Sequence, residues 1–234
     1  MSGGRRTAAI MQPTWLPYLG YFQLIAASDV FVFLDDVQFA RRSWQSRNRI
    51  LRGGREHLLT ASVRKAPREA AICDILLDEA TPWRSQHLAI LREAYATAPC
   101  FEAGYAFLES HYARQVGGRL ADLSIGLVQD AARRMGLTAQ FVRATGLGCG
   151  GARSEHLLAI CRAVGASDYL SPTGSADYMA EEQVFAAAEF PVEFRSLAVR
   201  EYPQTHKGDF IPFMSFLDAL MNVGWDGLAD LVAP

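Results

Sequence analysis

The sequence feature that most constrains the fold is an uninterrupted apolar run, Val30-Phe31-Val32-Phe33-Leu34. Valine and phenylalanine favour strands, and a strand without polar alternation suits a parallel sheet that is covered on both faces. A shorter apolar run at 8–11 precedes it, and residues 18–27 between the two runs carry apolar side chains at helical spacing. The order strand, helix, strand predicts a right-handed crossover with a functional edge at the carboxyl ends of the strands.

The remaining sequence extends this pattern on both sides of a helical middle. Residues 82–97, 104–117 and 119–135 each show apolar residues three and four apart, which predicts three helices. We therefore expect an α/β fold with a mainly parallel sheet and a helical subdomain. The predicted organisation is an N-terminal α/β half with a basic hairpin at 1–80, a helical insertion at 81–137, and a C-terminal half at 138–234 that completes the same domain.

The C-terminal half shows short strands alternating with helices. We expect helices at 154–164, at 181–188 and at 213–223, with Ser154 as the cap of the first. Strands are expected at 140–142, 168–170 and 192–194.

The composition excludes several classes of protein. The 234 residues carry 23 Lys and Arg against 25 Asp and Glu, a net charge of −2, so a protein that binds DNA by electrostatics alone is excluded. The four cysteines and five histidines show no CxxC, HxxxH or HExxH spacing, so we expect no disulfide framework and no bound metal. Neither a signal-peptide pattern nor an apolar run of membrane length is present, which predicts a cytoplasmic protein without a membrane span.

Polar residues follow the first two predicted strands. Gln12 comes after the first strand, and Asp35-Asp36 with Gln38 follows the second. A carboxylate beside a like charge can act as a general base, and an amide can bind a sugar hydroxyl, although a turn or a helix cap also explains such residues. We take Asp35 and Asp36 as candidate catalytic residues, and Gln12 and Gln38 as candidate substrate-binding residues.

A polar, basic stretch follows at 41–49, and Gly53-Gly54 predicts the turn of a hairpin. Arginine binds phosphate or carboxylate through paired N–H groups, so an anionic donor can dock on this stretch, with a solvated basic hairpin as the alternative. Asn48 and Arg49 are the candidate substrate-binding residues here, and Lys65 adds a positive charge if the hairpin folds back over the sheet.

Five further candidates are scattered along the chain. Tyr18 and Tyr21 can form a flat apolar wall for a sugar or a base, although aromatic residues at helical spacing usually pack in a core. Ser171 follows a predicted strand, and Gln204 precedes His206 in a loop. We add Ser171 and Gln204 as substrate-binding candidates, and His206 as a candidate acid or base near neutral pH, although a lone loop histidine is usually only exposed.

Spaced motifs carry a resemblance to a known family. The N-terminal motif is Gln12-Pro13-x-x-x-Pro17-Tyr18-x-Gly20-Tyr21-Phe22, followed by Asp35-Asp36-Val37-Gln38-Phe39 and Asn48-Arg49-Ile50. The C-terminal motif is Tyr202-Pro203-Gln204, with Phe210-Ile211-Pro212 and Ser215-x-x-Asp218-x-Leu220. Together with segment 154–174, these motifs resemble the WbqC-like protein family over nearly the whole chain.

The resemblance implies a role in the synthesis of O-antigen or other surface polysaccharides, or of natural products, because genes of the family tend to lie among genes for those pathways. Transfer of a glycyl or other aminoacyl group onto a sugar is the activity that it implies. It maps no catalytic residue onto this sequence.

A fainter similarity concerns Tyr18-Leu19-Gly20-Tyr21, which stands where nucleotidylyltransferases carry His-x-Gly-His, after a first strand and at the start of a helix. This similarity implies a Rossmann-like, nucleotidylyltransferase-like sheet. The two tyrosines lack the imidazoles that stabilise charge on a transferring phosphate, so adenylyl transfer does not follow from it.

The leading hypothesis is a group transferase that uses a small-molecule donor and acceptor. The carboxylates would take a proton from an attacking amine or hydroxyl, while Arg49 with Lys65 would hold an anionic donor. One alternative is an ATP-dependent nucleotidylyl-transferring or adenylate-forming enzyme with Mg²⁺ held by Asp35 or Asp36. Another is a non-catalytic assembly protein of a polysaccharide pathway. The sequence leaves open the donor, the acceptor, the cofactor and the formation of a homo-oligomer.

Overall fold

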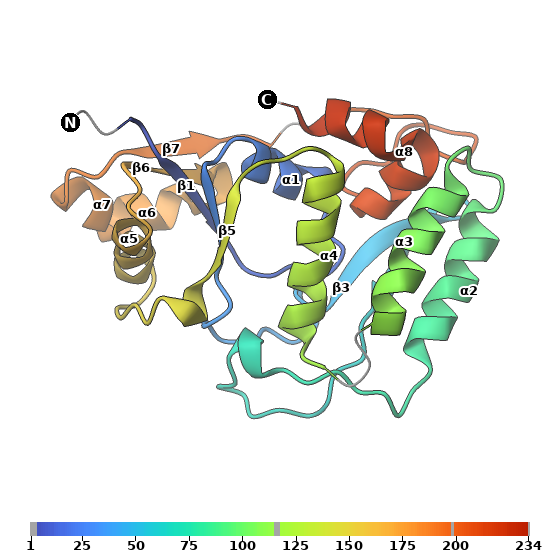
Figure 1. Cartoon of the computed structure of the whole chain (residues 1–234), viewed down its shortest axis with the longest axis horizontal. Helices are drawn as coiled ribbons and strands as arrows, with labels where there is room; N and C mark the ends of the chain where they lie inside the picture. Colours follow the sequence, from blue (N-terminus) through green and yellow to red (C-terminus); the bar gives the residue numbers. More distant parts are fainter. Residues whose placement is uncertain (1–3, 115–117, 198, 234) are drawn as a thin grey trace.

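The computed structural model describes residues 4–114, 118–197 and 199–233. A five-stranded sheet runs through it in the order β5-β2-β1-β6-β7, and every pairing in the sheet is parallel (Figure 1). The strands are β1 Thr7–Met11, β2 Val30–Phe33, β5 Gln140–Arg143, β6 Asp168–Pro172 and β7 Val192–Arg195. The expected α/β, Rossmann-like fold is therefore confirmed.

Helices cover both faces of this sheet. One group comprises α1 Leu19–Ala26, α2 Trp83–Tyr95, α3 Phe101–Arg114, α4 Leu120–Arg134 and α8 Phe216–Val232. The other comprises α5 Ser154–Ala163, α6 Ala176–Glu182 and α7 Val184–Ala187, and single 3-10 turns lie at Ile72–Asp74, Ala144–Gly146 and Thr173–Ser175. In Figure 1, α2, α3 and α4 lie together near α8, at the end of the molecule opposite α5, α6 and α7.

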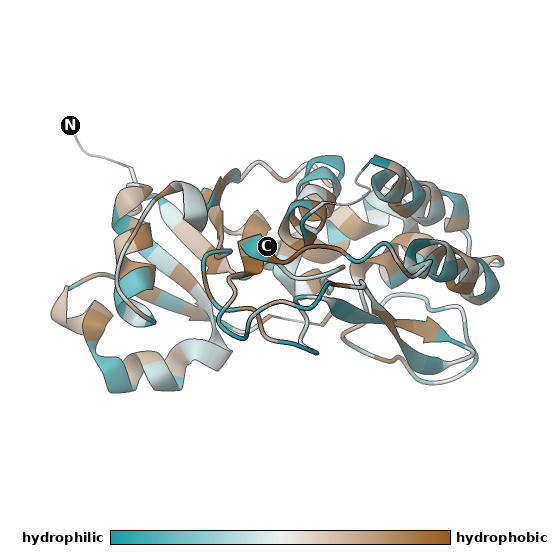
Figure 2. Ribbon diagram, turned by 90° about the horizontal axis from the view of Figure 1, so that it is seen from below, coloured by the Kyte–Doolittle hydropathy of each residue, from teal (hydrophilic) through white to brown (hydrophobic). Residues whose placement is uncertain are grey.

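Alternate residues of the central strands belong to two separate cores. Ala9, Phe31 and Phe33 pack with the group that contains α1, α4 and α8, whereas Ala8 and Val32 pack with α5, α6 and α7. Figure 2 shows apolar residues along the strands and on the helix surfaces that face them. Because both faces of β2 are covered, its sequence has no polar alternation.

The basic segment forms the predicted hairpin, with β3 Arg47–Arg52 antiparallel to β4 Arg55–Thr60. Gly53 and Gly54 make the turn, and both have positive φ angles, 59° and 72°, a conformation that glycine adopts without steric cost.

The order in which the strands are added to the sheet reverses at β1. The chain passes from β1 to β2 and then to β5 on one side, and it returns to the other side of β1 for β6 and β7. The carboxyl ends of β1 and β6 therefore flank a topological switch point, the usual ligand site of open α/β sheets.

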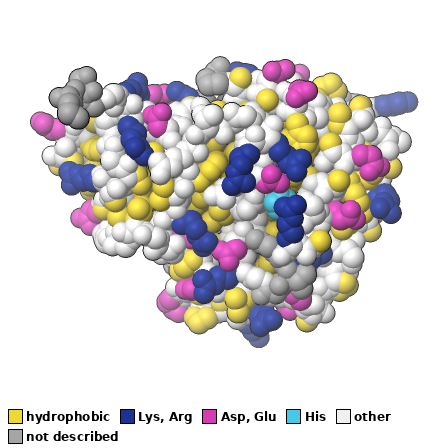
Figure 3. Space-filling model, viewed as in Figure 1, with side chains coloured by type: hydrophobic (Ala, Val, Ile, Leu, Met, Phe, Trp, Pro, Cys, Tyr) yellow, Lys and Arg dark blue, Asp and Glu magenta, His cyan; other side chains and the backbone are white. Residues whose placement is uncertain are grey.

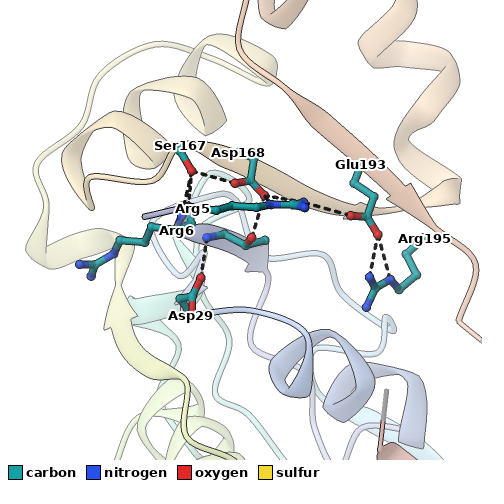
Figure 4. Close-up of polar contacts among 8 residues, drawn as sticks. Arg5, Arg6, Asp29, Ser167, Asp168, Glu193 and Arg195 are labelled. Atoms are coloured by element: carbon teal, nitrogen blue, oxygen red, sulfur yellow. Dashed lines mark hydrogen bonds and ion pairs between the residues drawn. The ribbon is translucent and has the colours of Figure 1, made fainter. Parts of the chain in front are cut away.

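Polar contacts fasten the opposite, amino edge of the sheet (Figure 4). Asp168 accepts hydrogen bonds from the Arg5 guanidinium and from the Thr7 hydroxyl, and Asp29 accepts one from the Thr7 amide at 2.7 Å. Glu193 bridges Arg5 and Arg195. The contacts of Asp168 and Asp29 are structural, because they lie at the amino ends of the strands, away from the carboxyl edge.

Three helix boundaries differ from the sequence-based expectation. Ser154 is the first residue of α5 rather than its cap, since the cap position is Arg153 with φ 51°. The single helix expected at 181–188 is instead α6 and α7, which meet at Gln183 in the left-handed conformation. The helix expected at 104–117 starts at 101, and its last positions, 115–117, lie outside the described residues.

The last helix is also displaced from the expected 213–223. It cannot begin at Phe213, where φ is 60°, so Ser215 caps it by accepting a hydrogen bond from the Leu217 amide. A break at Gly224, with φ 73°, lets the helix resume and continue to Val232.

None of the described helices is both long and apolar enough to span a bilayer. On the face shown in Figure 3, acidic and basic side chains lie interspersed, in keeping with the small net charge.

Candidate active site at the carboxyl edge of the sheet

A cavity of about 320 Å³ opens at the switch point between β1 and β6. We call it the switch-point cavity. Its apolar wall comes from the strands and α5, and its polar groups come from the strand ends and the 40–46 segment. The lining residues are Ile10, Met11, Gln12, Thr14, Leu34, Ser43, Trp44, Gln45, Leu157, Tyr169, Ser171, Pro172, Ser175 and Tyr178.

Gln12 is held at the mouth of this cavity by a paired amide. The Gln45 side chain donates to Gln12 Oε1 at 2.7 Å, while Gln45 Oε1 accepts the Ala40 amide at 2.8 Å. The buried Tyr21 hydroxyl donates to the Gln12 carbonyl at 3.1 Å. These contacts fix the Gln12 side chain and leave its NH₂ group available as a donor to a ligand.

Ser171 forms the opposite polar wall. It is fully buried at the carboxyl end of β6, and its hydroxyl lies 2.6 Å from the Ser175 hydroxyl. The structure thus brings two of the predicted substrate-binding residues, Gln12 and Ser171, to one cavity.

A second cavity of about 270 Å³ adjoins the first and shares Gln12, Leu34, Leu157 and Tyr178 with it. We call it the histidine cavity, because His156 lines it together with Val37 and Arg153. Arg153 is not a free cation, since it forms an ion pair with Glu182.

His156 forms a pair with the predicted catalytic residue Asp36. Its Nε2 atom lies 3.0 Å from Asp36 Oδ2, and its Nδ1 atom lies 3.1 Å from the Gly150 carbonyl oxygen. Asp36 stands between Leu34 and Val37, which line the cavity, and its side chain is 21% exposed. Its second oxygen, Oδ1, is buried without a hydrogen-bond partner among the described residues.

This geometry limits the positions that the protons of the pair can take. A carboxylate and a carbonyl oxygen are both acceptors, so each ring nitrogen of His156 faces an acceptor. Each neutral tautomer of His156 donates one of these two hydrogen bonds, and the ring donates both only when each nitrogen carries a proton. The pair therefore places a group that can give or take a proton beside the histidine cavity.

Asp35 lies in a very different environment from its neighbour. Its side chain is fully buried, and it accepts hydrogen bonds from the Arg143 guanidinium at 2.6 Å and from the Thr145 amide at 3.0 Å. The Thr145 hydroxyl contacts both carboxylate oxygens at 3.1 Å. Asp35 therefore joins β2 to the end of β5, and its lone pairs are already used.

Because protein donors already use the lone pairs of Asp35, this carboxylate is poorly placed to bind a metal cation. Among the described residues, no group of three His, Cys, Asp or Glu side chains is arranged to hold a metal ion. Of the two residues that the ATP-dependent alternative assigns to Mg²⁺, Asp35 does not fit the ion, since protein donors occupy its carboxylate, and Asp36 has one oxygen paired with His156.

A third cavity, of about 280 Å³, contains four other predicted residues and adjoins the switch-point cavity through Met11, Thr14 and Trp44. The predicted residues that line it are Tyr18, Tyr21, Asn48 and Arg49. The Asn48 amide is buried and donates to the Trp15 carbonyl at 3.0 Å, so this donor is already used within the protein. Arg49 stacks on Trp44 and forms an ion pair with Glu56 at 2.9 Å.

The remaining predicted residues lie elsewhere. Gln38 donates to the Arg68 carbonyl, and Lys65 lines a separate hollow beside the hairpin. Because Arg49 and Lys65 line different cavities, the structure does not bring them together around one anionic donor. His206 contacts Gln204 and lies against Gly54 at the turn of the hairpin, so it is not part of the switch-point or histidine cavity.

Gln204 belongs to a buried polar network around Asp218. That carboxylate accepts hydrogen bonds from Tyr95, from Tyr202 at 2.7 Å and from Gln204 at 3.2 Å. Burial raises the pKa of Asp218. The Ser215 amide, at the start of the same helix, donates to the Arg49 carbonyl at 2.7 Å. The N-terminal and C-terminal motifs are therefore joined by a backbone hydrogen bond.

Sequence reasoning missed His156, Gln45 and Tyr178. A signal for His156 was present, because a helix that follows a strand of a parallel sheet begins at the carboxyl edge. His156 is the third residue of such a helix, directly after a glycine-rich loop. The Gly150 carbonyl of that loop, rather than an amide, faces the histidine. Gln45 and Tyr178 had no comparable signal, since both come from irregular or short segments.

Comparisons with known proteins agree with the motifs. The family model of the WbqC-like protein family matches residues 12–230. The uncharacterized protein Rv1507c of Mycobacterium tuberculosis is 29% identical over 221 residues, which cover 94% of each chain. No solved structure matches the chain significantly. The match over residues 12–230 includes every lining residue of the switch-point and histidine cavities except Ile10 and Met11, and the chain belongs to the WbqC-like protein family.

Proposed function

We propose that this protein is a group transferase of polysaccharide or natural-product biosynthesis, which moves an acyl or aminoacyl group, such as glycyl, onto a sugar or amine acceptor. The observation that carries the proposal is the convergence of Gln12, Ser171 and the His156–Asp36 pair on adjoining cavities at the switch point. Sites of this kind combine an apolar wall with a few polar groups that fix the ligand.

The His156–Asp36 pair supplies the proton chemistry of such a transfer. The acceptor oxygen or nitrogen attacks the donor carbonyl carbon, and a new bond forms while the bond to the leaving group breaks. The pair gives its proton to the leaving atom and receives the proton that the acceptor loses, so it ends in its starting state. Proton transfer by a positioned side chain contributes roughly 10²–10⁴-fold to a rate.

Gln12 and the serine wall suit the acceptor. The Gln12 NH₂ group donates to a hydroxyl or carbonyl oxygen, whereas the Ser171 and Ser175 hydroxyls donate within the protein, Ser175 to the Pro172 carbonyl, and can only accept from a ligand. Trp44 and Leu157 supply apolar surface against which a sugar ring can pack. The combination favours a small polar acceptor over an extended apolar one.

The two rival functions have less support. Nucleotidylyl transfer with Mg²⁺ would require a free carboxylate, and Asp35 is already bonded to Arg143 and Thr145. An assembly protein would not require polar groups to converge on a concave site, whereas Gln12 and Ser171 do so.

The test is a transfer assay with a matched pair of variants. The purified protein is incubated with aminoacyl-adenylate analogues, acyl thioesters or nucleotide sugars as donors and with sugar and amine acceptors, and mass spectrometry detects the product. The wild-type protein should form a product, and Asp36→Asn should abolish it while the melting temperature stays nearly unchanged. Parallel loss of product and of melting temperature in Asp36→Asn would contradict the assignment, as would turnover that Asp36→Asn leaves intact.

A further inference from the structure

A second concave region lies beside the hairpin, outside the switch-point and histidine cavities. It has a volume of about 400 Å³, and we call it the basic hollow. Five cations line it from two sides of the chain: Arg41, Arg42 and Arg47 from the segment before β3 and its first residue, and Arg64 and Lys65 from the segment after β4. No Asp or Glu is among its lining residues.

This region concentrates the positive charge of an otherwise acidic chain. Residues 41–68 contain nine of the 23 Lys and Arg residues and one carboxylate, that of Glu56. The small net charge of the whole protein therefore conceals a strongly basic segment. Such a segment produces a local positive potential that attracts anions.

The cations of the hollow differ from those elsewhere on the hairpin. Arg49 and Arg52 are paired with Glu56 and Glu93, at 2.9 Å and 2.6 Å. The five cations of the hollow form no ion pair with any carboxylate of the described residues. The hollow thus gathers unneutralised charge at one place, which an anionic ligand would relieve.

The walls of the hollow are held in place by the backbone. The Ala61 amide donates to the Ser46 carbonyl at 2.8 Å, and the Arg64 amide donates to the Leu76 carbonyl at 2.9 Å. Arg41 donates across the hollow to the Ala66 carbonyl at 2.7 Å. The site is therefore partly organised before any ligand binds, which lowers the entropic cost of binding.

Arg42 occupies a strained position. Its φ angle is 58°, a left-handed conformation that is unfavourable for arginine and costs glycine almost nothing. The backbone alone would therefore favour glycine here, so Arg42→Gly should remove the charge without straining the chain.

We propose that the basic hollow binds the linked phosphates of a small ligand, such as a di- or triphosphate group. Five cations exceed what a single phosphate can neutralise, and arginine forks match phosphate oxygens in pairs. The hydroxyls of Ser46, Thr60 and Ser62 supply further donors along the same walls. The only aromatic lining residue, Phe39, is buried, so the hollow offers no surface on which successive bases of a nucleic acid can stack.

This site goes beyond the proposed transfer reaction, although the two regions share a wall. Ser43, Trp44 and Gln45 line the switch-point cavity, while Arg42 and Ser46, on either side of them, line the basic hollow. A bound oligophosphate would therefore hold the segment that carries Gln45, the partner of Gln12.

The test is calorimetry of the full-length protein with sodium triphosphate and, separately, with inorganic phosphate, at low and at raised salt. Triphosphate should bind more tightly than phosphate, and its affinity should fall as salt rises. Arg47→Gln and Lys65→Gln should each weaken triphosphate binding by roughly tenfold or more, since each removes a charged hydrogen-bond donor to the phosphates. The matched control is Arg55→Gln, which removes the same charge from the same hairpin outside the hollow and should leave the affinity unchanged.

Arg42→Gly separates binding from folding. It should weaken triphosphate binding without lowering the melting temperature, because glycine suits the backbone there. Equal losses in Arg55→Gln and Arg47→Gln would overturn the proposal, as would the absence of triphosphate binding at low salt. Tighter binding of RNA oligonucleotides that grows with their length would also overturn it, in favour of an extended nucleic-acid surface. None of these results depends on whether the protein transfers an acyl group.

Discussion

His156 Nε2 lies 3.0 Å from Asp36 Oδ2, which joins the start of α5 to the end of β2 across 120 positions of the chain. The second ring nitrogen faces the Gly150 carbonyl, so both nitrogens meet acceptors. Because of this pair, the carboxyl edge of the sheet contains a group that can transfer a proton as well as polar side chains that can bind a ligand.

The first prediction concerns the protons of this pair. In ¹⁵N NMR of the histidine rings, both nitrogens of His156 should give the signal of a protonated nitrogen. In Asp36→Asn the amide can turn its NH₂ group toward Nε2, which then needs no proton, so that nitrogen should change to the unprotonated signal. An unprotonated Nε2 in the wild-type protein would contradict the proposed proton between the two side chains.

Substitutions of the adjacent residues Asp35 and Asp36 should differ in their effect on stability. Asp35→Ala removes the buried partner of Arg143 and Thr145, and we expect it to lower the free energy of unfolding by about 1–3 kcal/mol, with Asp122 retained as a second partner of Arg143. Asp36→Asn should change it much less, because that side chain is partly exposed. Urea denaturation measures both, and similar losses in the two variants would show that Asp36 is structural too.

The protein should lose stability as the pH falls below about 6.5. Burial among aromatic side chains lowers the pKa of His87 to about 4, from 6.5 in the unfolded chain. Between pH 4 and pH 6.5 His87 is protonated in the unfolded chain but neutral in the folded protein. The contribution of His87 to the free energy of unfolding is therefore complete above pH 6.5 and declines toward pH 4.

The size of this loss follows from the two pKa values. It amounts to at most about 3 kcal/mol for the single histidine. His87→Gln cannot titrate, so the difference in unfolding free energy between wild type and variant should shrink as the pH is lowered from 7 to 4. A difference that stays constant over this range would show that His87 does not cause the acid sensitivity.

The polar network around Asp218 should be important for folding rather than for ligand binding. Tyr202→Phe removes one of three donors to a buried carboxylate, and we expect a loss of about 1–2 kcal/mol in unfolding free energy. Tyr18→Phe is the matched control, because the Tyr18 hydroxyl has no hydrogen-bond partner within the described part of the chain. If the two variants unfold alike, the hydroxyl of Tyr202 contributes nothing beyond its ring.

The sequence was sufficient for the sheet but not for the site. The unbroken apolar run of β2 and its companion β1 predict parallel strands, because only a sheet covered on both faces tolerates such runs. The sequence gives no reason to assign different roles to the adjacent residues Asp35 and Asp36. In the structure, however, Asp35 contacts Arg143 and Asp36 contacts His156. That outcome depends on strand β5 and helix α5, more than 100 residues away. The helix breaks at Gln183 and Gly224, where φ is 55° and 73°, were likewise not predicted from the sequence.

The most direct test of the account is a binding comparison at the switch point. A thermal-shift screen with nucleotide sugars, sugar phosphates, aminoacyl-adenylate analogues, and ATP with Mg²⁺ first identifies a stabilising ligand. Calorimetry then measures its dissociation constant for the wild-type protein, for Gln12→Ala, and for Gln38→Ala as the control outside the cavity. We predict a roughly tenfold weakening for Gln12→Ala and no change for Gln38→Ala, since a buried hydrogen bond to a ligand contributes roughly 1–2 kcal/mol. Equal affinity in all three proteins would contradict the assignment of the switch-point cavity as the functional site.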